Sequence, residues 1–200
     1  MSNTSSIQAG RSSGKVHQIT LTAILAAIIV IMSFTPLGYL NLGLVSITLL
    51  VIPVVIGGIV LGPVHGGILG AVFGATSFAK CFSEVFGGTL LSLNPVATFA
   101  ACFIPRILIG VVAGALFPVL RKIDRTGVAA FVVTSLAGTL TNTVLFIGMV
   151  VAFFRNSYFE GSPFWTIFVG FFSVNVAVEI VVGVLVSAAL SKVLLRFVPR

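Results

Sequence analysis

Four polar residues lie inside long apolar stretches of the chain, and their side chains are the first candidates for chemistry: Arg106, Asn142, Asn175 and Glu179. Asn175 and Glu179 are four residues apart, so a helix would place both on one face. Asn142 has a threonine on each side. An ionisable or amide group within an apolar helix is costly to bury, and its default interpretation is functional. These residues therefore indicate a binding site.

Two interpretations of Arg106 and Glu179 stay open. A guanidinium presents planar donors that match the two oxygens of a carboxylate, so Arg106 is suited to an acidic or carbonyl-bearing solute. Asn142 and Asn175 would then complete the solute site together with Glu179. Alternatively, Arg106 and Glu179 neutralise each other as a buried ion pair, and the asparagines join helices by hydrogen bonds. In that case the four side chains only hold the helices together.

The residue patterns of enzymes are missing from the sequence. The two histidines, His17 and His65, lie outside the apolar stretches, and no HExxH, GxSxG or Walker A pattern occurs. Cys81 and Cys102 are far apart and form no CxxC, so we expect two free thiols packed among helices rather than a zinc site or a redox pair. The sequence thus predicts no enzyme activity, no metal site and no cofactor.

The composition indicates that lipid surrounds the elements that carry these residues. Of the 200 residues, 58% are hydrophobic and 8% are charged, whereas charged residues make up about a quarter of an ordinary soluble domain. A membrane span needs about 20 apolar residues, so the apolar runs predict an all-α integral membrane protein with six transmembrane helices. The expected spans are residues 19–35, 45–61, 67–79, 96–120, 126–154 and 164–195. They form one membrane domain, 19–200, after a flexible cytoplasmic tail at 1–18.

Basic residues fall mainly on one side of this arrangement. Lys and Arg gather in the tail, in the turn at 121–125 and near the C-terminus, whereas Lys80 and Arg155 lie on the other side. The positive-inside rule then places both termini in the cytoplasm of a multi-pass plasma-membrane protein. The net charge of +7 is explained by this topology, so we expect no nucleic-acid partner.

Three loops face the outside in this topology, at 36–43, 80–95 and 155–163. Varied loops on a rigid scaffold commonly bind ligands. Three residues in these loops are expected to close over a solute: Tyr39, Asn94 and Tyr158.

Small residues recur at every fourth position in two regions. One stripe consists of Gly58, Gly62, Gly66, Gly70 and Gly74. Such spacing lets helix backbones approach closely. Because Pro63 interrupts the stripe, we expect it to serve two helices that pack within one subunit. Alanines at 23 and 27 repeat the spacing at the start of the first span.

Four segments in the first part of the chain have a recognisable combination of residues: Leu21–Ala27 (LTAILAA), Ser33–Leu40 (SFTPLGYL), Ser46–Gly58 (SITLLVIPVVIGG) and Leu61–Gly74 (LGPVHGGILGAVFG). With these segments the chain resembles the substrate-binding S-components of energy-coupling factor (ECF) vitamin transporters. The resemblance covers nearly the whole chain and is strongest over residues 19–79. It implies high-affinity capture of a vitamin from outside, followed by docking on a membrane coupling subunit that is shared with two ATPases.

The resemblance also implies roles for particular residues. Ala23 and Ala27 would form part of the docking surface for the coupling subunit. The single tryptophan and two tyrosines supply few rings for stacking a flavin or a pterin, although eighteen phenylalanines are present. A small carboxylated solute suits Arg106, Asn142 and Asn175 best, and the chain looks most like the pantothenate-type members. Folate, niacin and pyridoxine are the alternatives.

Two other classes of membrane protein stay open. A free-standing secondary transporter or channel would be expected to show inverted repeats or broken helices at matching positions, and the two halves of the sequence show no convincing repeat. A structural subunit without a solute would use Arg106 and Glu179 as a packing pair.

Overall fold

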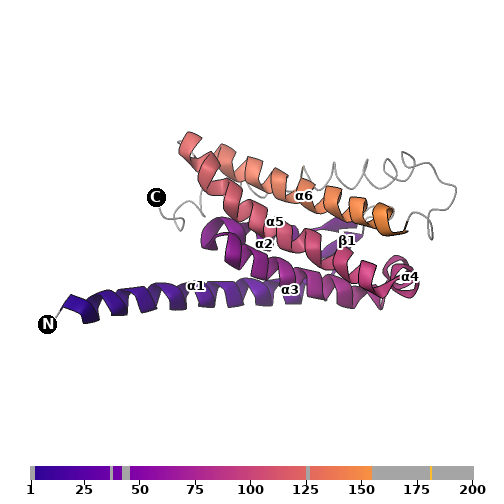
Figure 1. The fold of residues 1–200 in the computed structure, drawn as a ribbon, viewed down its shortest axis with the longest axis horizontal. Helices are drawn as coiled ribbons and strands as arrows, with labels where there is room; N and C mark the ends of the chain where they lie inside the picture. The colour runs from indigo at the N-terminus through magenta and orange to yellow at the C-terminus, as the bar shows by residue number, and fades with distance from the viewer. Residues whose placement is uncertain (1–2, 37, 42–45, 125–126, 155–180, 182–200) are drawn as a thin grey trace.

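The computed structural model describes residues 3–36, 38–41, 46–124, 127–154 and 181 of the chain. Helices dominate this part of the structure, and one short pair of strands follows the first helix (Figure 1). The elements in chain order are α1 (Asn3–Ser33), β1 (Tyr39–Asn41), β2 (Ser46–Thr48), α2 (Val51–Leu61), α3 (Pro63–Cys81), α4 (Val85–Leu93), α5 (Pro95–Ile123) and α6 (Val128–Phe154).

Three of these helices are long and apolar enough to cross a membrane: residues 15–33 of α1, α5 and α6. Helices α3 and α4 meet the same test together, as a pair bent by 91°. The apolar helix α2 has 11 residues, which is short for a full crossing. A helical membrane architecture is thus confirmed for the described residues, with three spans or four. The sixth expected span, 164–195, lies outside them except for residue 181, so the six-span count and the side of the termini stay predictions.

Helix α1 begins at Asn3, within the segment 1–18 for which the sequence predicts a flexible cytoplasmic tail, and this prediction of a flexible tail stays untested. Its first part extends beyond the other elements (Figure 1), and residues 15–20 are all exposed. Once the apolar part of α1 is helical, each further residue adds one hydrogen bond without a new nucleation step. The helix can therefore continue from the apolar part into the polar segment before it. A cytoplasmic position for this segment stays a prediction.

Two loops contain regular structure that the sequence analysis did not predict. The second span was expected from Val45, but α2 begins at Val51, because residues 46–48 form strand β2. This strand pairs antiparallel with β1 in the register Tyr39↔Thr48, and β-branched residues such as Ile47 and Thr48 favour a strand. The second case is helix α4, which lies within the loop expected at 80–95.

Glycines allow α2, α3 and α5 to pack closely. A Cβ atom on Gly66 or Gly110 would overlap the backbone of the facing helix, and one on Gly58 would lie 3.1 Å from the backbone nitrogen of Gly114. Gly58 belongs to α2 and Gly66 to α3, and both pack on α5. The prediction that the glycine stripe serves two helices within one subunit is confirmed.

Buried aromatic residues extend this core to α6. Phe73, Phe117 and Phe131 are almost fully buried, and the rings of Phe117 on α5 and Phe131 on α6 are 4.7 Å apart. Large apolar side chains are also exposed, on α1, α3, α5 and α6. Lipid can cover such side chains, so their exposure agrees with a membrane protein.

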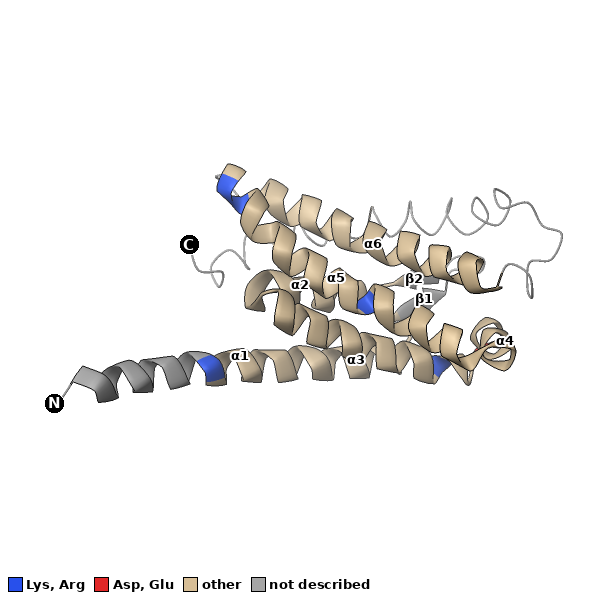
Figure 2. Ribbon diagram, in the orientation of Figure 1, with Lys and Arg blue, Asp and Glu red and all other residues tan. Residues whose placement is uncertain are grey.

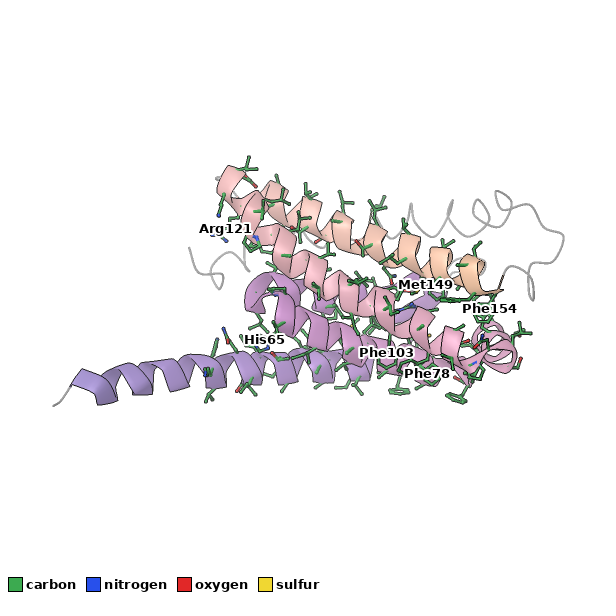
Figure 3. All side chains as sticks on the ribbon, viewed as in Figure 1. His65, Phe78, Phe103, Arg121, Met149 and Phe154 are labelled. Carbon is green, nitrogen blue, oxygen red and sulfur yellow. The ribbon has the colours of Figure 1, made fainter. Side chains whose placement is uncertain are left out.

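The two ends of the helical body differ in their side chains. Arg121 and His65 lie toward the end from which the first part of α1 extends, and Phe78, Phe103 and Phe154 lie toward the other end (Figure 3). Figure 2 shows basic segments of α1 and of the last turn of α5 at the first end. The last turn of α3, which contains Lys80, lies at the second end. Helix α4 is also at this second end, and so is the cavity described next.

Candidate functional site

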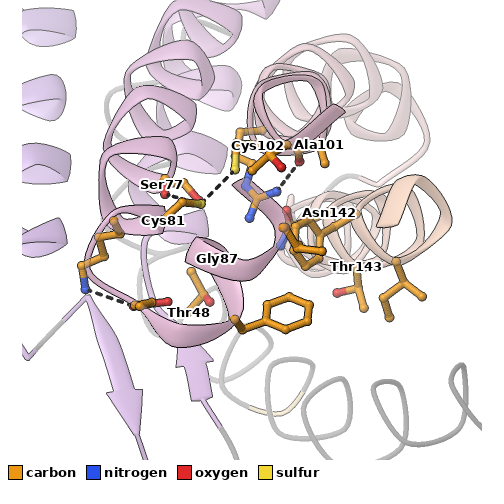
Figure 4. A pocket seen from close by; sticks show the side chains of 16 residues that line it. Thr48, Ser77, Cys81, Gly87, Ala101, Cys102, Asn142 and Thr143 are labelled. Atoms are coloured by element: carbon orange, nitrogen blue, oxygen red, sulfur yellow. Dashed lines mark hydrogen bonds and ion pairs between the residues drawn. The ribbon is translucent and has the colours of Figure 1, made fainter. Parts of the chain in front are cut away.

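A cavity of about 330 Å³ lies between α3, α4, α5 and α6 (Figure 4). Its volume is at the lower end of the range for small-molecule sites, roughly 300–1,000 Å³. Polar side chains lie along α3, α5 and α6, and α4 contributes apolar residues and a glycine. The lining residues are Thr48, Ser77, Lys80, Cys81, Glu84, Phe86, Gly87, Leu90, Thr98, Ala101, Cys102, Arg106, Asn142, Thr143, Phe146 and Ile147.

Arg106 is the buried cation of this cavity, with 8% of its surface exposed. Its Nη1 donates a hydrogen bond of 2.8 Å to the backbone oxygen of Ala101. Pro105 precedes it within α5, and a proline has no N–H to donate to the carbonyl four residues earlier. That carbonyl belongs to Ala101. Because of Pro105, the carbonyl oxygen of Ala101 has no helical N–H partner, and the guanidinium of Arg106 donates to this oxygen instead.

Two aromatic rings hold the guanidinium from the sides. Its central carbon lies 4.5 Å from the ring centre of Phe146 on α6 and 5.6 Å from that of Phe73 on α3. Cation–π contacts of this kind stabilise a desolvated guanidinium by about 2 kcal/mol or more. Arg106 is thus tied to three helices, and it presents a fixed positive charge at the cavity.

Helix α6 contributes an amide and a hydroxyl. Asn142 is buried and lines the cavity, and among the described residues its Oδ1 has no hydrogen-bond partner. The neighbouring Thr143 donates its hydroxyl to the backbone oxygen of Thr139 at 3.1 Å. A buried amide group that is left unbonded costs about 1–3 kcal/mol. Asn142 is therefore a suitable partner for a polar group of a bound solute.

Lys80 and Glu84 lie at the more exposed edge of the cavity. The Nζ of Lys80 is 3.9 Å from the Oε1 of Glu84, and the two side chains are 23% and 57% exposed. An exposed pair of this kind contributes little to stability. The pair places one basic and one acidic group at the edge of the cavity.

The structure brings two of the predicted site residues, Arg106 and Asn142, into one cavity. Asn94 is not among the lining residues; its side chain caps α5 by accepting a hydrogen bond of 3.1 Å from the backbone N–H of Ala97. The backbone of Tyr39 pairs with Thr48, which does line the cavity. The other three predicted site residues lie outside the described residues: Tyr158, Asn175 and Glu179. The proposed ion pair between Arg106 and Glu179 is therefore untested.

Ala23 and Ala27 are both exposed on α1. They lie one helical turn apart, and neighbouring positions such as Ile24 and Ile28 are exposed as well. This face of α1 is thus apolar and is not covered by the described residues. Its use for docking stays a prediction.

Several lining residues were not predicted. Ser77, Thr98 and Phe146 have side chains that occur throughout membrane helices, so their types alone carry no signal. Spacing could have identified one of them, because Phe146 lies one turn after Asn142 and so shares its helical face.

Comparison with known proteins shows the family. The family model described as "ECF transporter, substrate-specific component" matches residues 17–191. A relative named pantothenic acid transporter PanT, from Lactococcus lactis subsp. cremoris, is 30% identical over 88% of this chain and 92% of its own length. Another, named pantothenate transporter PanT, from Leuconostoc mesenteroides subsp. mesenteroides, is 29% identical over 94% of this chain and 97% of its own.

These comparisons confirm three expectations from the sequence. The family and the relatives are transporters and not enzymes. Together with the apolar helices, they identify a multi-pass protein of the plasma membrane that takes part in vitamin transport. The chain belongs to the family of substrate-specific components of ECF transporters.

Proposed function

We propose that this chain is the high-affinity pantothenate-binding subunit of an ECF importer, and that the cavity beside Arg106 is its solute site. The observation that carries the proposal is the placement of the Arg106 guanidinium and the Asn142 amide in one cavity of suitable volume. The printed names of the two relatives support the choice of pantothenate.

The chemistry of pantothenate matches the lining of the cavity. Its carboxylate suits Arg106, because a charge-assisted hydrogen bond is shorter and stronger than a neutral one. Its amide and hydroxyl groups suit the side chains of Asn142 and Thr143. Its two geminal methyl groups suit the apolar residues of α4 and α6, such as Phe86 and Ile147. The cavity thus offers a partner for each part of the solute.

The size of the cavity bears on the alternative vitamins. Folate carries a pterin and a glutamate, and a cavity of about 330 Å³ favours a smaller solute. Niacin and pyridoxine are small enough, but they lack the combination of aliphatic chain, amide and carboxylate. Competition of each vitamin against pantothenate ranks the four directly.

The proposal is tested by calorimetric titration of the full chain with pantothenate and with pantothenol, in which a hydroxymethyl group replaces the carboxylate. A hydrogen bond to a charged group contributes about 1.5–3 kcal/mol, so Arg106→Ala should weaken pantothenate binding by about 10- to 150-fold. The same variant should bind pantothenol as the wild type does, because the contact it removes is with the carboxylate. Arg121→Ala is the matched control, since Arg121 is not among the lining residues.

Three results would count against the proposal. If the wild type does not bind pantothenate, the solute is wrong. If a folded Arg106→Ala protein keeps its affinity, Arg106 is not in the site. If Arg106→Ala unfolds and Arg106→Ala with Glu179→Ala restores both stability and unchanged binding, the two residues form a packing pair.

We also propose that transport requires a membrane coupling subunit and two ATPases. The chain has no Walker A sequence with which to use ATP. The exposed pair Ala23 and Ala27 allows close approach of another helix. Uptake by the chain alone in liposomes, without ATPases, would contradict this proposal.

A further inference from the structure

Two cysteines meet in the wall of the cavity. The Sγ atom of Cys81, the last residue of α3, lies 3.7 Å from the Sγ atom of Cys102 on α5 (Figure 4). Cys81 is partly buried and Cys102 is buried, and both are free thiols in this structure. Both line the cavity that holds Arg106. The sequence analysis predicted no redox pair because the two cysteines are 21 positions apart in the chain. The antiparallel packing of α3 and α5 nevertheless brings their side chains together.

The distance between the two sulfurs is short enough for a disulfide to form by a small movement. A disulfide has an S–S distance of about 2.05 Å, so each sulfur would have to move by roughly 0.8 Å, which side-chain rotation can supply at a helix end. The thiol of Cys81 donates a long hydrogen bond, with an S···O distance of 3.5 Å, to the backbone oxygen of Ser77. This weak contact offers little resistance to the movement.

The surroundings favour reaction at this pair. Arg106 lies one helical turn after Cys102 and lines the same cavity, and a nearby guanidinium stabilises the thiolate that acts as the nucleophile. Gly87 of α4 packs on Cys81 so closely that a Cβ there would lie 2.7 Å from the Cα of Cys81. The helix α4 therefore covers one side of the pair, while the cavity gives small polar molecules access from the other.

We propose that Cys81 and Cys102 form a redox-active dithiol in the wall of the solute cavity, which hydrogen peroxide converts into a disulfide. One thiolate attacks a peroxide oxygen; an S–O bond forms, the O–O bond breaks, and water leaves after protonation. The second thiol attacks the resulting sulfenic acid, which forms the S–S bond and releases a second water. In sum, two thiols and one hydrogen peroxide give one disulfide and two waters, and the sulfurs lose the two electrons that the peroxide gains.

The experiment uses the reduced full chain in lipid nanodiscs, treated with hydrogen peroxide and then with a thiol-alkylating reagent. We expect an intramolecular disulfide, seen as a mass lower by two hydrogens, no alkylation, and recovery of both thiols with dithiothreitol. Cys81→Ser and Cys102→Ser should each abolish this species. Two alkylatable thiols after excess peroxide, or oxidation only to sulfinic acid or to linked dimers, would overturn the proposal.

A second experiment tests whether a solute bound in the cavity shields the dithiol from peroxide. This experiment rests on the proposed function. A bound solute excludes peroxide, so pantothenate at ten times its Kd should slow disulfide formation about tenfold, in proportion to the unoccupied fraction. Free glutathione in the same sample is the control for peroxide consumption. If titration shows that pantothenate binds but the rate is unchanged, the pair does not share the solute cavity. If titration shows no binding, the proposed solute fails, and disulfide formation still decides the dithiol proposal.

Discussion

Gly70 offers the sharpest test of how the fold positions Arg106. Gly70 lies on α3, where a Cβ would overlap the backbone oxygen of Arg106 and would lie 2.7 Å from its carbonyl carbon and 2.8 Å from the Cα of Ile107. Carbon atoms in favourable contact are about 3.5–4.0 Å apart. Gly70→Ala must therefore move α3 and α5 apart by roughly 1 Å, at the residue that carries the guanidinium.

This displacement should lower both the stability of the protein and its affinity for pantothenate. Overpacking of this kind costs about 1–3 kcal/mol, and in a chain of this size each kcal/mol lowers the melting temperature by about 2–4 °C. A displacement of 1 Å also stretches a hydrogen bond of about 2.9 Å beyond the usual limit of about 3.2 Å. Losing one charge-assisted bond in this way corresponds to a Kd about 10- to 150-fold higher for pantothenate.

The assay pairs thermal unfolding with titration of pantothenate well below the melting temperature. Gly148→Ala is the matched control, because Gly148 lies within α6 and no heavy atom of the described residues lies within 4 Å of an added Cβ. That variant should bind as the wild type does and should be as stable or slightly more stable, since alanine favours a helix. If Gly70→Ala also melts and binds as the wild type does, the close packing of α3 on α5 does not position Arg106.

Three further predictions address docking, orientation and the proline of α5. Replacing Ala23 and Ala27 together with tryptophan should abolish uptake by the assembled transporter and leave pantothenate binding intact; loss of binding as well would contradict a docking role. In a background without Cys81 and Cys102, an impermeant thiol reagent should label Glu84→Cys in intact cells and not Asp124→Cys; labelling at position 124 would reverse the topology. Pro105→Ala should raise the melting temperature, because proline in a helix interior costs about 3 kcal/mol. The same variant should weaken pantothenate binding several-fold, because the new N–H competes with Arg106 for the carbonyl of Ala101. Unchanged affinity would show that this carbonyl does not position the guanidinium.

The parts of the fold that sequence predicts well are those fixed by local composition. Apolar runs identified the long helices α5 and α6 within a few residues, because lipid admits only backbone that satisfies its own hydrogen bonds. Polar groups stand out against such runs, which is why the residue types alone were enough to select Arg106 and Asn142. The ribbon of β1 and β2 and the helix α4 were missed, since short elements between spans depend on what they pack against.

The contact between Cys81 and Cys102 could not be predicted from local sequence. Cys81 and Cys102 are distant in sequence, and their 3.7 Å contact exists because α3 and α5 run in opposite directions and approach closely. That approach depends on a series of glycines on α3, from Gly66 to Gly74, each of which packs on the backbone or side chains of α5. The glycine spacing predicted close packing of helices, but it did not identify which helix would be the partner. Without knowing that α5 is the partner of α3, the contact between the two thiols could not be predicted.

Pro105 and Arg106 illustrate a signal that was present in the sequence and was not used. A proline within a membrane helix frees the carbonyl four residues earlier, and in lipid no water is available to satisfy it. A long cationic side chain next to the proline can reach back to that carbonyl, as Arg106 does to Ala101. The backbone then fixes one edge of the guanidinium. A Pro-Arg step inside an apolar run therefore predicts an arginine held in place by its own helix, which is a requirement for a rigid anion-binding group.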